Sequence, residues 1–331
     1  MALAEEWKTA HAPGRICLLG DNVDLIEKPV LAAAISAFLS ISIKKRNDDR
    51  VILNADDIGF QEEFTLRDKL PLLSPLKYIE AVYHRLQSDV TSGFEATITS
   101  QIPVSAGMSS STALCIAFIR ALCQTYDISL TTAEIAELSF LVEREDLNIE
   151  CGRMDQYAIA FGGVTFIDTG PAPGVEIIPV SSLPIVVADT QETHDTQKLQ
   201  LWLQDRLRAG EKKLIDSLNR VVNLVEKGKD ALLCGDLVTL GKLMDQQQIE
   251  ENIMGTSTER LNSFCRTAIG AGAWGAKQMG AGGGGCTVAL CPPEKIKFVQ
   301  DSLIASGAPA WTFEVYHYLD HDHPDPLNVE S

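Results

Sequence analysis

The clearest pattern of hydrophobic and polar positions lies between residues 94 and 122. The run Phe94-Glu-Ala-Thr-Ile-Thr-Ser-Gln-Ile102 is typical of a strand. After a polar loop, apolar residues recur at the spacing of one helix face, namely Ala113, Leu114, Ala117, Phe118, Ala121 and Leu122. The pattern therefore predicts a strand, a loop and a helix in direct succession.

Further patterns predict a mixed first half. Residues 46–50 read Arg-Asn-Asp-Asp-Arg, a strong turn signal between the alternating stretch 39–44 and the apolar run 51–53, so we expect a hairpin there. Shorter runs predict strands at 14–19, 29–35, 162–168 and 183–188, and helices at 76–90 and 131–147.

The second half has a different character. From about residue 194 to 271 the apolar residues follow helical spacing, and a glycine run at 280–285 is followed by a predicted strand at 287–290. A helix near 293–305 and a strand near 311–315 complete the pattern. We therefore expect an α+β protein with an N-terminal domain at 1–180 and a C-terminal domain at 181–331.

Composition and charge narrow the function. The 331 residues carry a formal net charge of −17, which argues against a nucleic-acid-binding surface. No apolar stretch approaches the roughly 20 residues that span a bilayer, and the N-terminus lacks a signal-peptide pattern. The eight cysteines form no CxxC pair and are typical of buried free thiols. We expect a soluble cytoplasmic protein, monomeric or homodimeric, without nucleic-acid or membrane partners.

The loop that runs into the predicted helix at 113 is a candidate phosphate site. It reads Pro103-Val-Ser-Ala-Gly-Met-Ser-Ser-Ser111. A helix N-terminus offers unpaired N–H groups and the positive end of the macrodipole to an anion. Gly107 permits a close backbone approach, and Ser109, Ser110 and Ser111 supply hydroxyls for phosphate oxygens or a cation. The alternative is an ordinary serine-capped helix after a turn.

Two more segments carry candidate chemistry. The run Met279-Gly-Ala-Gly-Gly-Gly-Gly-Cys286 contains G-x-G-x-x-G, but we expect a helix before it and a strand after it, the reverse of a dinucleotide-binding fingerprint. Its glycines fit a backbone that closely approaches another loop or a phosphate. Asp155, in Cys151-Gly-Arg-Met-Asp-Gln156, begins a predicted helix, where it is either a cap or a carboxylate that orients a hydroxyl nucleophile.

Together these segments resemble the three motifs of the GHMP kinase superfamily. The segment Gly14-Arg-Ile-Cys-Leu-Leu-Gly-Asp-Asn-Val-Asp24 matches the first, the serine loop the second and the glycine run the third, in the expected order. The resemblance implies an ATP-dependent kinase with a two-domain α+β fold and its active site in the cleft between the domains.

The resemblance also implies roles for individual residues. ATP would be bound by Pro103, Ser105, Ala106, Gly107, Met108, Ser109, Ser110, Ser111, Gly282 and Gly283. Ser111 and Glu143 would ligate Mg²⁺. Asp155 would act as base or orienting carboxylate, and Arg15 would stabilise its ionised form and offset charge on the transferring phosphoryl group. The acceptor would contact Asp21, Asn22, Asp24, Asp155 and Gly283.

Details of the motifs favour the galactokinase-like sugar branch. Arg15 stands where mevalonate kinases usually carry Lys, and Asp24 stands where galactokinases hold sugar hydroxyls. Two features depart from that branch. Galactokinases read Gly-Glu-His-Thr-Asp-Tyr where this chain reads Gly20-Asp-Asn-Val-Asp-Leu25, and the glycine run is closer to that of mevalonate or heptose kinases.

Three hypotheses follow. The first is a kinase that phosphorylates a monosaccharide at the anomeric hydroxyl, with ATP and Mg²⁺ as cofactors and a sugar 1-phosphate as product. The second is a mevalonate kinase-like enzyme that acts on a small hydroxy acid. Such an enzyme would need a cationic side chain to bind the substrate carboxylate. The third is a catalytically silent sensor of sugar or ATP that has kept the fold.

Overall fold

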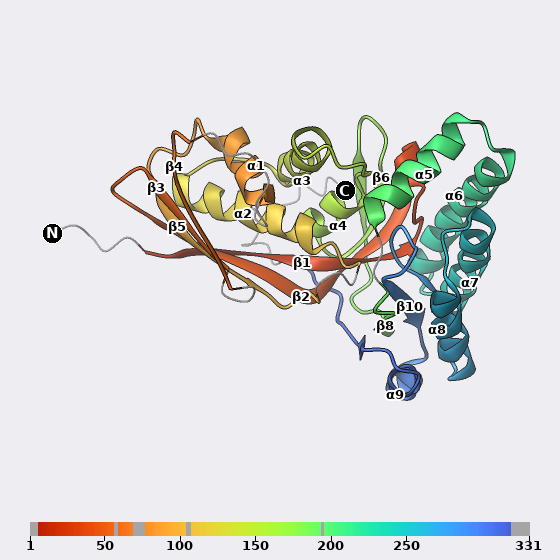
Figure 1. The fold of residues 1–331 in the computed structure, drawn as a ribbon. Coiled ribbons are helices and arrows are strands. Elements are labelled where there is room, and N and C mark those ends of the chain that lie inside the picture. The colour runs from red at the N-terminus through yellow and green to blue at the C-terminus, as the bar shows by residue number, and fades with distance from the viewer. Residues whose placement is uncertain (1–5, 56–58, 69–76, 104–106, 193–194, 319–331) are drawn as a thin grey trace.

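The computed structural model describes residues 6–55, 59–68, 77–103, 107–192 and 195–318. The first half of the chain contains both strands and helices, and the second half contains a long run of helices (Figure 1). This is the α+β class that the sequence predicts.

A seven-stranded sheet forms the first half, and its longest strand is β2 (Val30–Lys45). One edge of β2 pairs with β1 (Lys8–Leu19), and the other pairs in succession with β6 (Val164–Asp168) and β5 (Phe94–Ser100). The sheet is completed by β3 (Arg50–Ala55), β4 (Phe60–Thr65) and β7 (Gly174–Ile178). The two runs predicted at 29–35 and 39–44 are therefore one continuous strand.

The predicted hairpin around residues 46–50 is wrong. β5 lies between β2 and β3, pairing antiparallel with the first and parallel with the second. The turn at 46–50 is real, but it carries the chain across β5. The local sequence specifies the reversal, whereas the partner of each strand is set by a segment more than 40 residues away.

Four helices cover one face of this sheet (Figure 1). They are α1 (Lys77–Leu86), α2 (Ser110–Tyr126), α3 (Thr132–Leu141) and α4 (Met154–Phe161). The buried face of α2 packs on β1 and β2, and Phe118 contacts Phe94 of β5 with ring centroids 5.9 Å apart. The strand–loop–helix unit predicted between residues 94 and 122 is confirmed, and its apolar residues form part of the main core.

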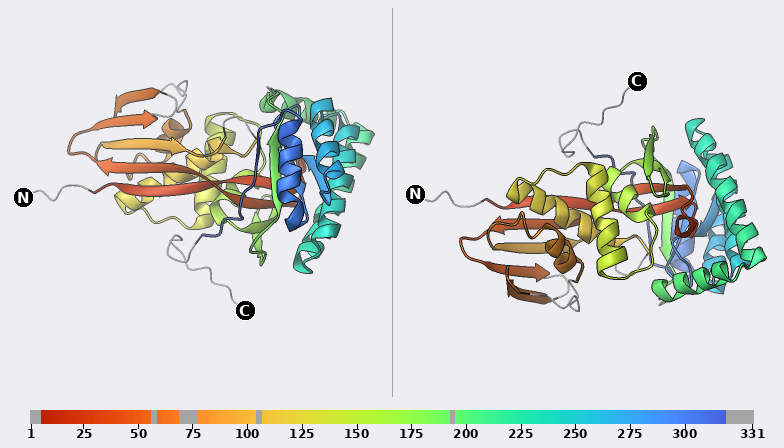
Figure 2. Two further views of the ribbon diagram at one scale, coloured as in Figure 1. Left: turned by 90° about the horizontal axis from the view of Figure 1, so that it is seen from below. Right: turned by 90° about the horizontal axis from the view of Figure 1, so that it is seen from above.

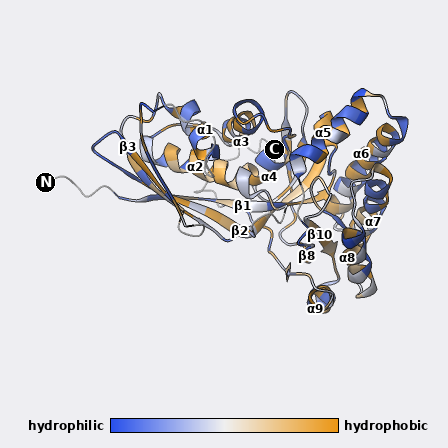
Figure 3. Cartoon of the chain, viewed as in Figure 1, coloured by the Kyte–Doolittle hydropathy of each residue, from blue (hydrophilic) through white to orange (hydrophobic). Residues whose placement is uncertain are grey.

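The second half begins with β8 (Ile185–Asp189) and continues through a helical layer (Figure 2). The helices are α5 (Thr196–Arg208), α6 (Lys212–Leu233), α7 (Leu237–Met254) and α8 (Glu259–Gly270). Apolar and polar faces alternate around them, as Figure 3 shows, and α7 and α8 pack on the small sheet through β9 (Gly275–Gln278). The predicted domain boundary at residues 180 and 181 remains a prediction.

The small sheet has the order β11–β8–β10–β9. β9 and β10 (Cys286–Leu290) form an antiparallel pair, and the glycine run joins them. The expectation of a helix directly before the glycines is therefore wrong, because α8 ends at Gly270 and β9 intervenes. A strand still follows the glycines, so the segment does not open a helix as a dinucleotide fingerprint does.

After α9 (Ile296–Ala305) and β11 (Ala310–Trp311), the chain returns to the first sheet. The amide of Tyr316 donates to the carbonyl of Ala34 at 2.9 Å, and that of Ser36 donates to the carbonyl of Glu314 at 3.0 Å. These bonds fill the interval of β2 between its pairings with β6 and β5. The last described residues thus tie the second half of the chain to the centre of the first sheet.

All eight cysteines are free thiols, as expected, and Cys234 is the exposed one among them. Among the described helices, none combines the length and the apolar character needed to cross a lipid bilayer.

Candidate active site

Three distant segments meet at the carboxylate of Asp155, the second residue of α4. Arg15 of β1 donates from Nε to Asp155 Oδ1 at 2.6 Å and from Nη1 to the carbonyl of Gly107 at 2.6 Å. Ser109, just before α2, donates its hydroxyl to Asp155 Oδ2. The Arg15 side chain is 5% exposed and that of Asp155 is 28% exposed. The carboxylate is thus fixed from one side and open on the other.

Ser109 does not cap the helix that it precedes. Its backbone is left-handed (φ 59°), an uncommon conformation outside glycine, and its side chain makes no capping bond to α2. The hydroxyl is turned to Asp155 instead. The first amides of α2 therefore lack a side-chain cap from this residue, which leaves them for an anion.

Glu143 approaches the same region from a single π-helical turn, Val142–Asp146, that follows α3. Such turns occur often at functional sites. Thr112 of α2 donates to Glu143 Oε1 at 2.7 Å. The side chain is buried, and burial, with a further contribution from the charge of Asp155, raises the pKa of Glu143 to about 7.

Glu143 and Ser111 suit a magnesium ion because both offer oxygen ligands to one cavity, and a dication would favour the ionised form of the buried carboxylate. No cluster of three or more Asp, Glu, His or Cys side chains able to hold a metal occurs in the described part of the chain. A Mg²⁺ ion here would therefore take its other ligands from water and substrate phosphates, as Mg²⁺ usually does.

Two cavities adjoin Asp155. The larger, about 390 Å³, extends along the N-terminus of α2, and the smaller, about 80 Å³, lies toward the turn after β1. Both are bordered by Arg15, Cys151, Asp155, Thr196, Gln200, Gly280 and Ala281. Asp155 thus borders both cavities, the arrangement needed to act on a group that passes from one to the other.

The larger cavity collects half of the ten residues predicted to bind ATP, together with Glu143, a predicted Mg²⁺ ligand. It is bordered by Gly107, Met108, Ser109, Ser110, Ser111 and Glu143. Pro103 is not among the residues that border it, and Ser105 and Ala106 lie outside the described residues. Lys77 and Tyr78, at the start of α1, also border it.

The smaller cavity is bordered by Asn22 and Asp24, two of the predicted substrate contacts. Asp24 is half-buried, and burial, followed by the charge of Asp155, raises its pKa to about 7. Gly152 makes room for it, since a Cβ there would lie 2.2 Å from Asp24 Oδ2. Gly152 is thus required to bring the Asp24 carboxyl group to the cavity.

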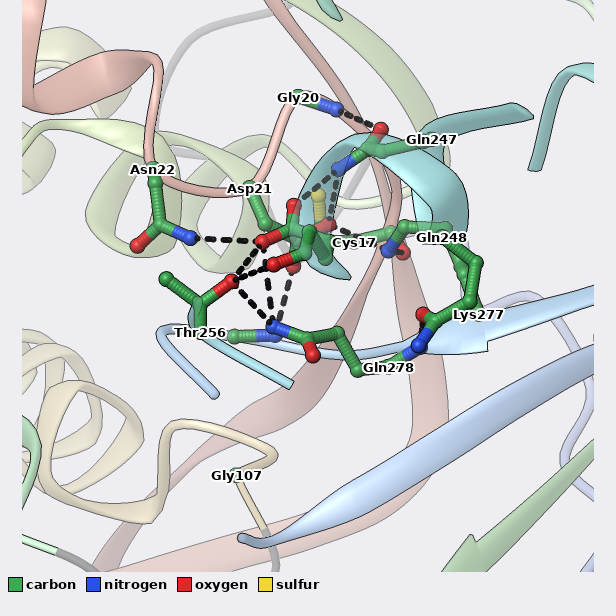
Figure 4. A network of polar contacts seen from close by, with 12 residues as sticks. Cys17, Gly20, Asp21, Asn22, Gly107, Gln247, Gln248, Thr256, Lys277 and Gln278 are labelled. Atoms are coloured by element: carbon green, nitrogen blue, oxygen red, sulfur yellow. Dashed lines mark hydrogen bonds and ion pairs between the residues drawn. The ribbon is translucent and has the colours of Figure 1, made fainter. Parts of the chain in front are cut away.

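Asp21 was also predicted to contact the acceptor, but it borders neither cavity. Its side chain has no exposed surface, and it accepts hydrogen bonds from the amide of Gly280 at 2.6 Å and from Gln247 at 2.9 Å, beside an ion pair with Lys277 (Figure 4). Both of its carboxylate oxygens are thus bonded to groups within the protein. We therefore assign it a supporting position in place of a substrate contact.

Gly282 and Gly283 also differ from prediction, since neither borders the two cavities. A Cβ on Gly282 would lie 2.2 Å from the carbonyl oxygen of Thr256, and the amide of Gly283 donates to that oxygen at 2.7 Å. The glycine run therefore closely approaches a neighbouring loop. This is one of the two explanations that the sequence suggested for the glycines, the other being a close approach to a phosphate. The parts of this loop that reach the cavities are Met279, Gly280 and Ala281.

Sequence reasoning missed the contribution of α5. Thr196 and Gln200 border both cavities from the second half of the chain, and the buried Oε1 of Gln200 has no hydrogen-bond partner among the described residues. No motif marks these residues. Their helical spacing predicts α5 itself but not the cavity that it reaches.

Comparisons with known proteins indicate the family of this chain. The protein-family model described as "GHMP kinases N terminal domain" matches residues 77–163, and the family model described as "GHMP kinases C terminal" matches residues 223–308. A mevalonate kinase from Pyrococcus horikoshii is 32% identical over 92% of this chain and 94% of its own length. A galactokinase from Pyrococcus furiosus is 26% identical over 94% of this chain and 96% of its own length.

Among solved structures, Lactococcus lactis galactokinase complexed with galactose superposes with a TM-score of 0.82 at 20% identity, covering 95% of each chain. At that identity the similarity concerns the fold.

The buried Glu143 predicts a pH-dependent stability. Its pKa is about 7 in the folded protein against 4.5 ordinarily, so its contribution to the free energy of unfolding is complete below about pH 4.5 and is lost as the pH rises through about 7. Glu143→Gln, which cannot ionise, should raise Tm by about 2–6 °C at pH 8 without divalent cations. At pH 5.5 it should have a smaller effect.

Differential scanning calorimetry at the two pH values tests this. Glu226→Gln, which removes an exposed carboxylate on α6, is the matched control. It should leave the difference in Tm between pH 8 and pH 5.5 the same as in wild type. A Glu143→Gln protein that melts no higher than wild type at pH 8 would contradict the account.

Proposed function

The chain belongs to the GHMP kinases, a family of ATP-dependent phosphotransferases, and we propose that it transfers the γ-phosphoryl group of ATP to a hydroxyl of a monosaccharide. The observation that carries the proposal is the position of Asp155 between the two cavities, with Arg15 and Ser109 bonded to its carboxylate. One cavity suits the donor and the other suits the acceptor.

The larger cavity is the proposed donor site. The uncapped N-terminus of α2 and the hydroxyls of Ser110 and Ser111 offer donors to phosphate oxygens without adding fixed charge to an acidic protein. Lys77, which also borders this cavity, adds a cation. Ser111 and Glu143 would hold Mg²⁺, which when bound neutralises charge on the phosphates.

Asp155 is the proposed catalytic carboxylate. One oxygen is bonded to Arg15 and the other to Ser109, so its orientation is set before an acceptor arrives. From this position it can accept the proton of an acceptor hydroxyl or align that hydroxyl for attack on phosphorus. Arg15, with Nη1 fixed by the carbonyl of Gly107, keeps a positive charge beside the transferring group.

The smaller cavity favours a neutral polyol. Its described border carries the carboxyl groups of Asp24 and Asp155, the amides of Asn22 and Gln200, and one cation, Arg15, which is already paired. Sugar hydroxyls can donate to carboxylates and exchange bonds with amides. A substrate carboxylate would meet two acids without a free cation, which costs free energy. We propose the anomeric hydroxyl as the acceptor and a sugar 1-phosphate as the product.

A small hydroxy acid is the second candidate. It is favoured by a specific observation, the 30–32% identity to mevalonate kinases over 92% of the chain. Lys77 could meet a substrate carboxylate only from the larger cavity, because it does not border the smaller one. The acceptor cavity therefore argues for the sugar, and the sequence relatives argue for the acid.

An acceptor panel separates these candidates. ADP release from Mg-ATP should be measured with monosaccharides, sugar acids and mevalonate, and we expect turnover with at least one neutral monosaccharide. Turnover with mevalonate alone would contradict the sugar proposal. ATP binding without turnover on any acceptor would favour a sensor that has kept the fold.

A second test addresses Asp155. Asp155→Asn should lower kcat by at least about 100-fold, because the amide cannot take a proton. The dissociation constant of Mg-ATP, measured by calorimetry, should change by less than about threefold because the donor cavity is intact. Asp216→Asn, an exposed change on α6, is the control. Unchanged turnover in Asp155→Asn would remove Asp155 from the mechanism.

A further inference from the structure

A buried ion pair, Asp21–Lys277, is in contact with the glycine loop, and both of its residues are labelled in Figure 4. Asp21, at the turn after β1, and Lys277, in β9, form a salt bridge in which both side chains have no exposed surface. Lys277 also donates from Nζ to the carbonyl of Cys17 at 3.1 Å. The pair therefore joins the end of β1 to the strand that leads into the glycine loop.

The second oxygen of Asp21 reaches the loop itself. The amide of Gly280 donates to Asp21 Oδ1 at 2.6 Å. Gly280 and the next residue, Ala281, border both the donor and the acceptor cavities. One carboxylate thus connects the interior to the shared wall of the two cavities.

The network around the pair extends to the far end of the loop. Gln247 of α7 donates to Asp21 at 2.9 Å and to Glu251 at 3.0 Å, and Thr256 donates its hydroxyl to Glu251 at 2.5 Å. The carbonyl of Thr256 accepts the amide of Gly283. Both ends of the segment from Gly280 to Gly283 are therefore bonded, directly or through Thr256, to the same buried cluster.

The charges in this cluster are nearly balanced. Burial, followed by the charge of Asp21, raises the pKa of Glu251 to about 8, so Glu251 is largely protonated at neutral pH. Lys277 and Asp21 then form a neutral pair. A buried pair is seldom more stable than apolar side chains of the same size, so stability alone gives a weak reason for it.

The geometry gives a stronger reason, and we propose that the Asp21–Lys277 pair is a positioning device for the active site. Lys277 holds the Asp21 carboxylate, and Asp21 holds the Gly280 amide, which sets the position of Gly280 and Ala281 in the shared wall of the cavities. Asp21 and Lys277 are positioning residues that touch neither substrate. The expected effect on kcat/KM rests on the proposed function, whereas the expected fixing of the Gly280 amide does not.

Two double variants test the proposal without leaving a single charge buried. Asp21→Asn/Lys277→Met removes both charges but keeps an oxygen for the Gly280 amide, whereas Asp21→Leu/Lys277→Met removes that oxygen too. We expect the Leu variant to lose at least about tenfold in kcat/KM relative to the Asn variant, because small misplacements of an active-site wall are costly. Equal kcat/KM in the two would overturn the proposal.

Hydrogen exchange gives a readout that needs no acceptor. In wild type the Gly280 amide should exchange at least about 100-fold more slowly than a free peptide. That protection should persist in the Asn variant and fall in the Leu variant, with β9 and β10 still protected. Exchange of Gly280 at the free-peptide rate in wild type would overturn the inference even if the Leu variant does not fold. Slow exchange in a protein that phosphorylates no acceptor would contradict the proposed function alone.

Discussion

The structure depends on one constraint, that the carboxylate of Asp155 is bonded by two donors distant in sequence. Arg15 comes from β1 and Ser109 from the loop before α2, 140 and 46 residues away. Through these two bonds, β1, the residue before α2 and the start of α4 converge at Asp155. The left-handed backbone of Ser109 is a local cost of that convergence, since its hydroxyl serves Asp155 and leaves α2 uncapped.

The same convergence concentrates acidic groups. Asp24, Glu143 and Asp155 lie around two cavities that share lining residues, and burial raises the pKa of the first two to about 7. Such groups are unfavourable to the protein when ionised and favourable to a metal ion or to a hydroxyl that donates to them. These features are consistent with the proposed binding of Mg-ATP and of a neutral acceptor.

The sequence predicted what depends on local pattern and motif. It identified the strand–loop–helix unit ending in α2 and the α+β class, and it named Arg15 and Ser109, the two residues bonded to the Asp155 carboxylate. It did not predict that Asp21 and Asp24 have different environments. Asp21 is buried in an ion pair with Lys277, which is distant in the sequence, whereas Asp24 borders the smaller cavity. It also missed Gln200, since the approach of α5 to the cavity is set by packing in the second half of the chain.

The central claim is that a phosphoryl group crosses from one cavity to the other past Asp155. Phosphorus NMR of Mg-ATP, the protein and a neutral monosaccharide that supports ADP release tests it most directly, because it identifies the product. The account predicts loss of the γ-phosphate resonance and a new phosphomonoester signal coupled to the anomeric proton. Loss of the γ-phosphate resonance with inorganic phosphate as the only new signal would contradict it.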